Sequence, residues 1–276
     1  MKPADLKSTL KSGNPAFGFM LSAIITSKWA RYFEGCTLDY CVIDWEHGAR
    51  DRAEIANLVY ILQKSNITAI VRIPYPDPVF VAMALDAGAD GVLVPYVESI
   101  DDARACASKL RLHPFKGEYL EKATKSNEFP SDKTRNYLSK RHEDHFFILG
   151  IESVPGVERL NALLKASNPD GIFVGPNDLS TSLGIPDEVD NPLYLNTLKN
   201  IISTGNDFGI PTMIHQQTME SSKTAIELGA RWILHSGDLG ILLRATQNEF
   251  SELRNFSTQF YGQIKDVKLE DTIDTV

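Results

Sequence analysis

The chain has 276 residues, and its 28 Lys and Arg against 36 Asp and Glu give a formal net charge of −8. Without a basic stripe, nucleic acid is not expected as a partner, and no run approaches the roughly 20 apolar residues that span a membrane. Three cysteines without a CxxC pair indicate reduced thiols, and the amino terminus lacks the apolar core of a signal peptide, so we expect a cytoplasmic protein.

Short apolar runs alternate with longer amphipathic runs along most of the chain. The predicted strands are Phe17–Leu21, Asp39–Asp44, Thr68–Ile73, Gly91–Tyr96, Phe146–Glu152, Gly171–Val174, Pro211–His215 and Arg231–His235. The predicted helices are Arg52–Gln63, Val79–Ala87, Ser99–Leu110, Val157–Lys165, Leu193–Thr204 and Glu220–Leu228. This alternation predicts right-handed βαβ units, and eight strands in about 250 residues favour an α/β fold, the single-domain (β/α)8 TIM barrel. A doubly wound open sheet is the alternative, but it would need a Gly-rich turn after its first strand, and the chain has none there.

Two segments interrupt the alternation. Residues 113–145 are too long for a simple connection and are rich in Lys, Glu, Asp and Ser, which predicts a surface excursion. Residues 266–276 are polar and acidic, as is typical of a poorly ordered tail. We therefore predict one barrel domain over residues 1–265.

Ionisable side chains follow several of the predicted strands at the point where each strand ends. With the polar Ser236, they are Asp44, Glu46 and His47 after the second strand, Arg72 on the third, Glu152 on the fifth, Asp178 after the sixth, His215 on the seventh, and Ser236 and Asp238 after the eighth. The carboxyl ends of barrel strands meet at one mouth, where the active site of such enzymes lies. The sequence therefore predicts that these groups share one pocket.

Glu152 and Asp178 are candidate ligands for a metal ion. Two carboxylates from neighbouring strands, with no Cys and no obligatory His, suit a hard octahedral cation such as Mg²⁺ or Mn²⁺. Each residue also has a simpler interpretation. Glu152 could be an acid at a helix amino terminus, and Asp178 could cap a short helix that starts at Leu179.

Several motifs, taken together, resemble the HpcH/HpaI aldolase family. They are Asp44-Trp45-Glu46-His47-Gly48, Val71-Arg72-Ile73-Pro74, Leu85-Asp86-Ala87-Gly88-Ala89, Leu93-Val94-Pro95, Ile151-Glu152-Ser153 and Gly175-Pro176-Asn177-Asp178-Leu179-Ser180. The resemblance implies a (β/α)8 barrel, often with an exchanged last helix and assembled as a homo-oligomer, a hexamer. It also implies an aldolase that depends on Mg²⁺, Mn²⁺ or Co²⁺ and cleaves 4-hydroxy-2-oxo acids to pyruvate, or a related 2-oxo acid, and an aldehyde.

The resemblance also implies a role for each matching residue. It implies that Glu152 and Asp178 bind the metal ion, that Glu46 holds metal-bound water, and that the backbone of Asn177-Asp178 receives the substrate carboxylate. Arg72 would contact the oxo group of the substrate. His47 would be the acid/base, with Asp86 as its carboxylate partner and Asp44 as a supporting acid. From the residues alone, Arg72 could instead be an ion-pair partner of Asp44 or Glu46.

The chain departs from the family pattern at two positions. Gly150 stands where a Gln is common, and Glu118 stands where an Arg is common. These departures leave two alternatives to the aldolase: an enzyme that uses the same metal enolate differently, for example to decarboxylate oxaloacetate, and a barrel that binds a small acid without turnover.

Overall fold

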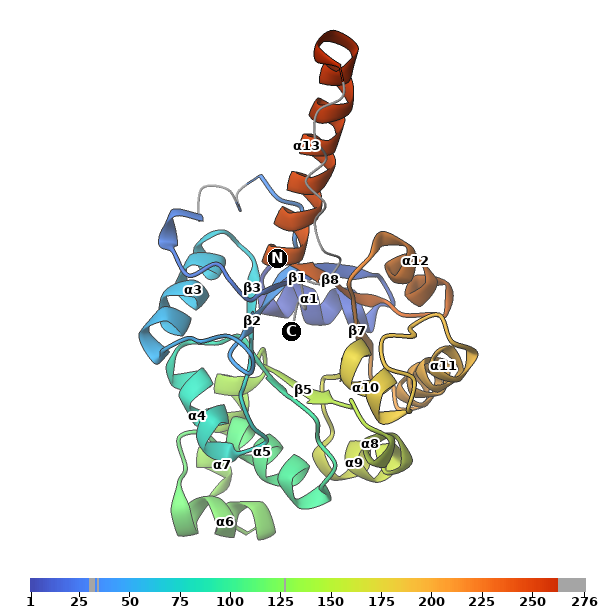
Figure 1. Ribbon diagram of the computed structural model, residues 1–276. Helices are drawn as coiled ribbons and strands as arrows, with labels where there is room; N and C mark the ends of the chain where they lie inside the picture. Colours follow the sequence, from blue (N-terminus) through green and yellow to red (C-terminus); the bar gives the residue numbers. More distant parts are fainter. Residues whose placement is uncertain (30–32, 34, 127, 263–276) are drawn as a thin grey trace.

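Eight parallel strands close into a barrel in the order of the sequence, as Figure 1 shows for the computed structural model. The structure describes residues 1–29, 33, 35–126 and 128–262. The strands are β1 Ala16–Leu21, β2 Tyr40–Asp44, β3 Thr68–Arg72, β4 Gly91–Val94, β5 Phe146–Gly150, β6 Gly171–Val174, β7 Thr212–Gln216 and β8 Trp232–Gly237. Because β1 pairs with β8, the sheet is closed, which confirms the single-domain barrel and excludes the open sheet.

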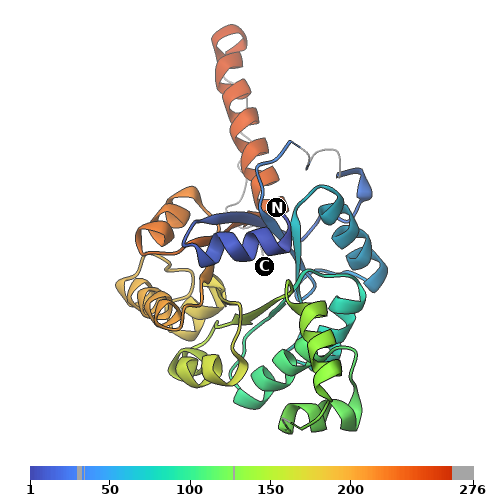
Figure 2. The same cartoon turned by 180° about the vertical axis from the view of Figure 1, so that it is seen from behind.

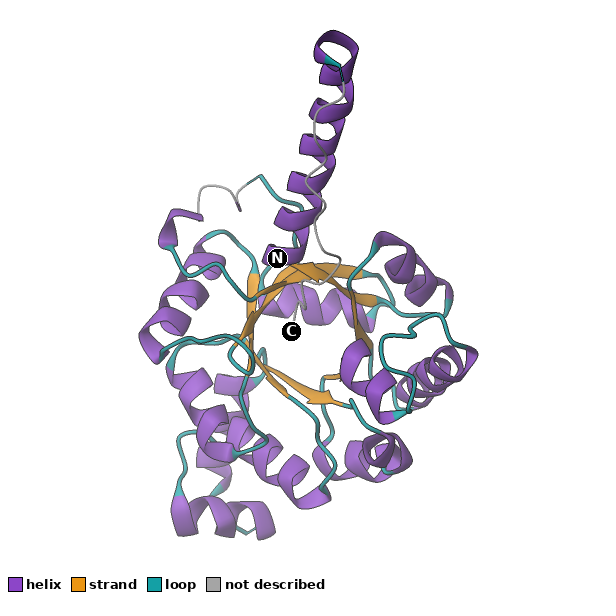
Figure 3. Cartoon of the chain, in the orientation of Figure 1, coloured by secondary structure: helices purple, strands orange, loops and turns teal. Residues whose placement is uncertain are grey.

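Helices surround the barrel on its outer side (Figure 3). They are η1 Ser27–Trp29, α3 Arg52–Lys64, α4 Pro78–Asp86, α5 Ile100–Leu112, α6 Gly117–Lys125, α7 Asp132–His142, α8 Val154–Glu158, α9 Leu160–Ser167, α10 Pro176–Ser182, α11 Pro192–Asp207 and α12 Met219–Glu227. The last helix, α13 Asp238–Tyr261, follows β8 and projects away from the barrel (Figure 1). An additional helix, α1 Pro3–Lys11, crosses one end of the barrel, as the view from behind shows (Figure 2). It buries Leu6 and Leu10 against the strands, so the active-site mouth has to lie at the other end.

Side chains alternate between the inside of the barrel and the helix layer, as the two-residue period of strands requires. Along β2, Tyr40 and Val42 point into the barrel interior, while Cys41 and Ile43 pack under the helices. Trp232 fills the interior near the closed end, with its ring centroid 5.7 Å from that of Tyr40. The inside of the barrel is therefore a packed core and not an open channel.

Several predicted boundaries were wrong by a few residues. β4 ends at Val94 instead of Tyr96, because Tyr96 has a φ of +33°, which a strand does not accommodate. β5 ends at Gly150 instead of Glu152. The helix predicted over Val157–Lys165 is two helices, which meet at Arg159. The predicted tail, residues 266–276, lies outside the described residues.

Two regions contain helices that the sequence patterns did not predict. Residues 113–145 contain α6 and α7, which pack on α5. After β8, the 24-residue α13 runs away from the barrel (Figure 1) and exposes a series of large apolar side chains. No helix among the described residues is long and apolar enough to cross a membrane.

The stability of the barrel should depend strongly on Trp232. Replacing this fully buried side chain with Ala leaves a cavity between β2, β5 and β8, so we expect the free energy of unfolding to fall by about 3–5 kcal/mol in urea denaturation. Tyr60→Ala, at a side chain that is 61% exposed on α3, serves as the control and should change it by about 0.5 kcal/mol or less. Equal effects of the two substitutions would contradict this description of the core.

Candidate active site

Arg72, the last residue of β3, lies at the centre of the mouth. Its Nε donates to Asp44 Oδ1 at 3.0 Å, and its Nη2 lies 2.9 Å from Asp44 Oδ2, so the pair is bidentate. Its Nη1 lies 3.1 Å from Glu46 Oε2. The side chains of Arg72 and Asp44 are 7% and 3% exposed. β2 and β3 are neighbours with Asp44 opposite Arg72, so the register of the sheet itself produces this ion pair.

Asp44 also shapes the turn that follows β2. Its Oδ1 accepts hydrogen bonds from the backbone N–H groups of Glu46 and His47. Arg50 also holds this turn, because its Nε donates to Asp44 O at 3.1 Å. Its Nη1 and Nη2 donate to the carbonyl groups of Ile24, in the loop after β1, and of Leu21, the last residue of β1. The sequence analysis gave Arg50 no role, and its position six residues beyond Asp44 was the only signal.

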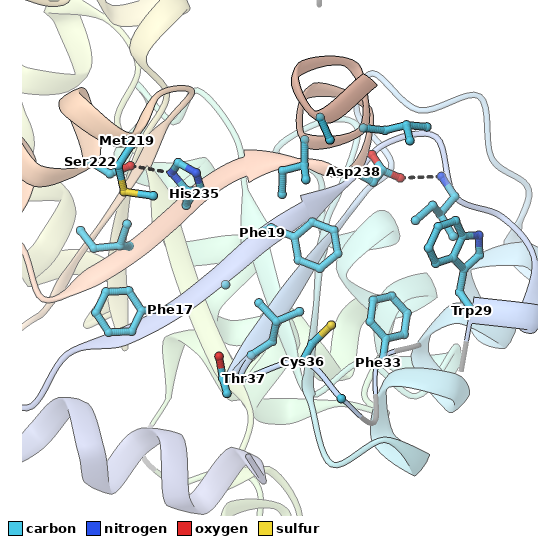
Figure 4. A pocket seen from close by; sticks show the side chains of 18 of the residues that line it. Phe17, Phe19, Trp29, Phe33, Cys36, Thr37, Met219, Ser222, His235 and Asp238 are labelled. Atoms are coloured by element: carbon cyan, nitrogen blue, oxygen red, sulfur yellow. Dashed lines mark hydrogen bonds between the residues drawn. The ribbon is translucent and has the colours of Figure 1, made fainter. Parts of the chain in front are cut away.

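Asp238 fixes the loop after β1 from the opposite side. Its carboxylate accepts hydrogen bonds from the backbone N–H groups of Ser22, Ala23 and Ile24, as Figure 4 shows in part. Asp238 therefore binds backbone N–H groups of the loop after β1, and Arg50 binds carbonyl groups at the start of and within the same loop. The sequence placed Asp238 at the mouth, and it does line the mouth cavity, but strand-end position alone does not distinguish a structural acid from a catalytic one.

Glu152 lies beyond the end of β5 and is 3% exposed. Its Oε2 accepts the backbone N–H of Tyr96 at 2.6 Å, whereas its Oε1 is buried and has no hydrogen-bond partner. A Cβ built on Gly175 would lie 2.6 Å from Glu152 Oε1 and 3.5 Å from Asp178 Oδ2. The two carboxylates predicted to bind a metal therefore both border the space beside Gly175.

Burial has the largest effect on the pKa values of these acids, and the charges around Arg72 modify it. Burial raises the pKa of Glu152 to about 7, and Asp178 and Asp44 add to this rise while Arg72 opposes it. Burial likewise raises the pKa of Glu46 to about 8, with Glu152 among the acids that contribute. For Asp44, the ion pair with Arg72 outweighs the effect of burial and lowers the pKa. One guanidinium is thus shared by more carboxylates than it can neutralise.

His47 and Asp86 are not brought together within the chain, so the predicted partnership between them is not found in this structure. His47 is 42% exposed at the mouth, and its Nε2 lies 3.9 Å from Glu46 Oε2. Asp86 is the last residue of α4 and lies 3.1 Å from His113 Nε2. Because the helix after a strand returns toward the strand starts, Asp86 lies at the far end of the barrel from His47.

The open space at the mouth is a cavity of about 160 Å³. It is lined by several of the predicted residues, namely Asp44, His47, Arg72, Asn177 and Asp178, together with Met20, His215 and Gln217. His215 is a residue to which the sequence analysis gave no role. Burial, with the nearby charge of Arg72, lowers its pKa to about 4, so it is neutral near pH 7.

The two departures from the family pattern have different surroundings. A Cβ on Gly150 would lie 2.7 Å from Val94 O and 3.0 Å from Tyr96 N, so the segment after β4 fits only against a glycine. Glu118 lies on α6, whose packing partner is α5, at the periphery of Figure 1. Gly150 therefore bears directly on the site, and Glu118 does not lie at the mouth of this chain.

The donor set fits a divalent cation of the magnesium type. Among the described residues, no three side chains of His, Cys, Asp or Glu converge as a ready-made metal cluster. Glu152 Oε1 and Asp178 nevertheless supply two hard oxygen ligands, and Mg²⁺ characteristically binds through one or two carboxylates and keeps several waters. A cation there would also neutralise the excess of carboxylates around Arg72.

Comparison with known proteins confirms the resemblance that the motifs indicated. The family model described as HpcH/HpaI aldolase/citrate lyase matches residues 20–233. A 5-keto-4-deoxy-D-glucarate aldolase of Escherichia coli O157:H7 is 28% identical over 209 residues, which are 76% of this chain and 81% of the relative. The solved structure of an HpcH/HpaI aldolase from Desulfitobacterium hafniense has a TM-score of 0.78 and 26% identity, covering 90% of this chain and 96% of its own.

A more distant solved structure shares the fold. It is the citrate lyase beta subunit of M. tuberculosis complexed with oxaloacetate and magnesium, with 15% identity and a TM-score of 0.51, over 83% of this chain and 93% of its own.

The raised pKa values predict how the stability of the metal-free protein depends on pH. Between about pH 4.5 and pH 7 the unfolded chain ionises Glu152 while the folded chain keeps it protonated, so the free energy of unfolding falls as the pH rises through this window. Glu152→Gln removes this cost, so in urea denaturation with EDTA it should be more stable than the parent by roughly 2–3 kcal/mol at pH 8, with little gain at pH 4.

Glu158→Gln is the matched control, because Glu158 is exposed on α8, six residues away along the chain. It should follow the pH profile of the parent. The electrostatic description of the site is wrong if Glu152→Gln gains no stability over the parent between pH 4 and pH 8.

Proposed function

Because the chain belongs to the HpcH/HpaI aldolase/citrate lyase family, we propose that it is a divalent-metal-dependent aldolase that cleaves or forms 4-hydroxy-2-oxo acids. Membership of this family makes the chain a carbon–carbon lyase. The observation that carries the metal dependence is the buried, unpartnered Oε1 of Glu152, which borders the same space beside Gly175 as Asp178. A relative named for the cleavage of a keto sugar acid supports the substrate class.

The proposed metal ligands are Glu152 and Asp178. When bound, a divalent ion supplies positive charge that polarises the 2-oxo group and stabilises the enolate left by carbon–carbon cleavage. Mg²⁺, Mn²⁺ and Co²⁺ all suit such a site, and the magnesium reported with the distant citrate lyase subunit supports the first. Glu46, whose pKa is raised by burial and in part by the nearby Glu152, is proposed to hold a water of the ion.

Arg72 provides the positive charge that belongs to the protein itself. Asp44 holds its Nε and Nη2, so the guanidinium cannot swing away from the mouth. A fixed cation at the position where an oxyanion develops costs no reorganisation during the reaction. We therefore assign to Arg72 the binding of the 2-oxo group. The ion pair with Asp44, which was the alternative considered from the sequence, holds the guanidinium in place for this role.

His47 is the proposed acid/base, which takes the proton from the 4-hydroxyl group during cleavage. It is exposed to the mouth cavity and directly follows Glu46 in a turn that Asp44 fixes. Asn177 and Asp178 lie in the first turn of α10, where backbone N–H groups have no partner within the helix. These N–H groups are proposed to receive the carboxylate of the substrate.

An assay of pyruvate release from 4-hydroxy-2-oxo acids tests the function. We expect turnover that EDTA abolishes and that added Mg²⁺ or Mn²⁺ restores, and we expect Glu152→Ala to lower kcat/KM by at least about 100-fold, since it removes a metal ligand. Glu158→Ala, a carboxylate loss on the neighbouring helix, should keep full activity. Turnover that survives EDTA, or a Schiff base trapped by borohydride, would contradict the proposal, and oxaloacetate decarboxylation without aldol cleavage would support the alternative enzyme.

A homo-oligomer is the second proposal, and it rests on α13. In a (β/α)8 barrel the helix after each strand normally covers the sheet, but α13 leaves the barrel (Figure 1). The uncovered face of β1 and β8 forms an apolar groove of about 750 Å³, whose wall includes Phe17, Phe19 and Met219 (Figure 4). The distal half of α13 exposes Leu253, Phe256 and Phe260 at 58–66%.

The proposed occupant of this groove is the distal half of α13 from a second copy of the chain. Groove and helix are both apolar, and each would otherwise expose surface of a kind that soluble proteins normally bury between subunits. Exchange of an identical element between copies brings such surfaces together at little cost. The family resemblance extends this dimer to a hexamer.

Light scattering after gel filtration tests the assembly. We expect the parent to have the mass of two or more chains and the double variant Leu253→Asp/Phe256→Asp to have the mass of one, because two carboxylates would have to enter the apolar groove. Tyr119→Asp, at a side chain that is 63% exposed on α6, is the control and should leave the mass unchanged. A parent with the mass of a single chain would refute the exchange.

A further inference from the structure

The two oxygens of Glu152 have different surroundings, and this difference bears on how the residue can bind an ion. Oε2 accepts the backbone N–H of Tyr96 at 2.6 Å. Oε1 has no partner and faces the space beside Gly175 and Asp178. The Tyr96 N–H occupies one of the two lone pairs of Oε2, so an ion bound through both oxygens would have to compete with this hydrogen bond. The hydrogen bond therefore favours Oε1 alone as the oxygen that binds the ion.

The position of this N–H group depends on Gly150. The backbone after β4 passes so close to Gly150 that a Cβ there would lie 2.7 Å from Val94 O, 2.9 Å from Pro95 Cα and 3.0 Å from Tyr96 N. Val97 N donates to Gly150 O at 2.9 Å and ties the segment down. Tyr96 keeps a φ of +33°, a strained value for a residue with a side chain, and this value persists because the contacts around it determine the backbone.

We propose that Gly150 and the Tyr96 backbone N–H act as a positioning device that makes Glu152 a one-oxygen ligand and so selects Mg²⁺ over Ca²⁺. This inference rests on the proposed metal site of Glu152 and Asp178. Mg²⁺ takes a compact octahedral shell, binds through one or two carboxylates and keeps several waters. Ca²⁺ takes 6 to 8 oxygens and gains from carboxylates that bind through both oxygens. When its Oε2 is held by the Tyr96 N–H, Glu152 offers one oxygen, which suits Mg²⁺ and is one fewer than Ca²⁺ would gain from a bidentate carboxylate.

The chain offers matched variants that separate this device from its surroundings. Gly150→Ala introduces the Cβ that forces the segment after β4 outward and lengthens the bond to Oε2. Gly35→Ala is the control for glycine loss, since a Cβ there meets nothing within 4 Å. Tyr96→Gly removes the phenol ring but keeps the backbone N–H and tolerates the positive φ. Only the first variant should alter the choice between ions.

The experiment is calorimetric titration of each protein with Mg²⁺ and with Ca²⁺. We expect the parent to bind Mg²⁺ more tightly, and the ratio of the Ca²⁺ Kd to the Mg²⁺ Kd to fall about tenfold in Gly150→Ala, the factor that a hydrogen bond to a charged group represents. Gly35→Ala and Tyr96→Gly should keep the ratio of the parent. An unchanged ratio in a folded Gly150→Ala, or a parent without preference for Mg²⁺, would overturn the inference while leaving the metal site in place. A parent that binds neither ion would instead remove the proposed function.

A second measurement needs no variant. Hydrogen exchange, followed by mass spectrometry on peptides that contain Tyr96, reports whether the N–H keeps its acceptor. We expect its protection to persist in the Mg²⁺-loaded protein, because Oε2 stays outside the metal shell, and to decrease when Ca²⁺ is bound. Loss of protection on loading with Mg²⁺ would overturn the inference.

Discussion

The ion pair between Arg72 and Asp44 is the interaction on which the site depends. It forms because the register of β2 and β3 places the two residues opposite each other, so the barrel itself builds it. A bidentate pair with both side chains buried fixes the guanidinium in one orientation. Glu46 and Glu152 lie within the field of that single cation, and burial, with a smaller contribution from neighbouring acids, raises the pKa values of both although Arg72 opposes the rise. A divalent ion at Glu152 and Asp178 would complete the balance.

Around this pair, the backbone does much of the positioning. Glycine at two positions determines the state of Glu152. At Gly150 it lets the segment after β4 approach, and at Gly175 it keeps space open beside the free oxygen. On the other side of the mouth, Asp238 and Arg50 hold the loop after β1 by its N–H and carbonyl groups. The reacting groups therefore project from rigid strand ends, and the loops between them are tied to charged side chains.

The sequence predicted the barrel and the meeting of Asp44, Arg72, Glu152 and Asp178, because parallel strands with polar ends leave few other arrangements. It did not predict α6 or α7, which lie in the Lys- and Glu-rich stretch interpreted as a surface excursion, or α13, although apolar residues recur along α13 at helical spacing. It paired Asp86 with His47 by resemblance, whereas chain direction along α4 carries Asp86 to the other end of the barrel. The close approach at Gly150 is a contact between backbone segments far apart in sequence, and residue types along one chain do not reveal such contacts.

We propose that a divalent ion binds between Glu152 and Asp178, beside an Arg72 held by Asp44. A crystal of the protein grown with Mn²⁺ and pyruvate tests this most directly, because the anomalous signal of manganese locates the ion without reference to the protein. We expect one strong peak within coordination distance of Glu152 Oε1 and Asp178, with Oε2 still on the Tyr96 N–H and the oxo group of pyruvate near Arg72. A peak elsewhere, or pyruvate bound at the mouth without an ion, would contradict it.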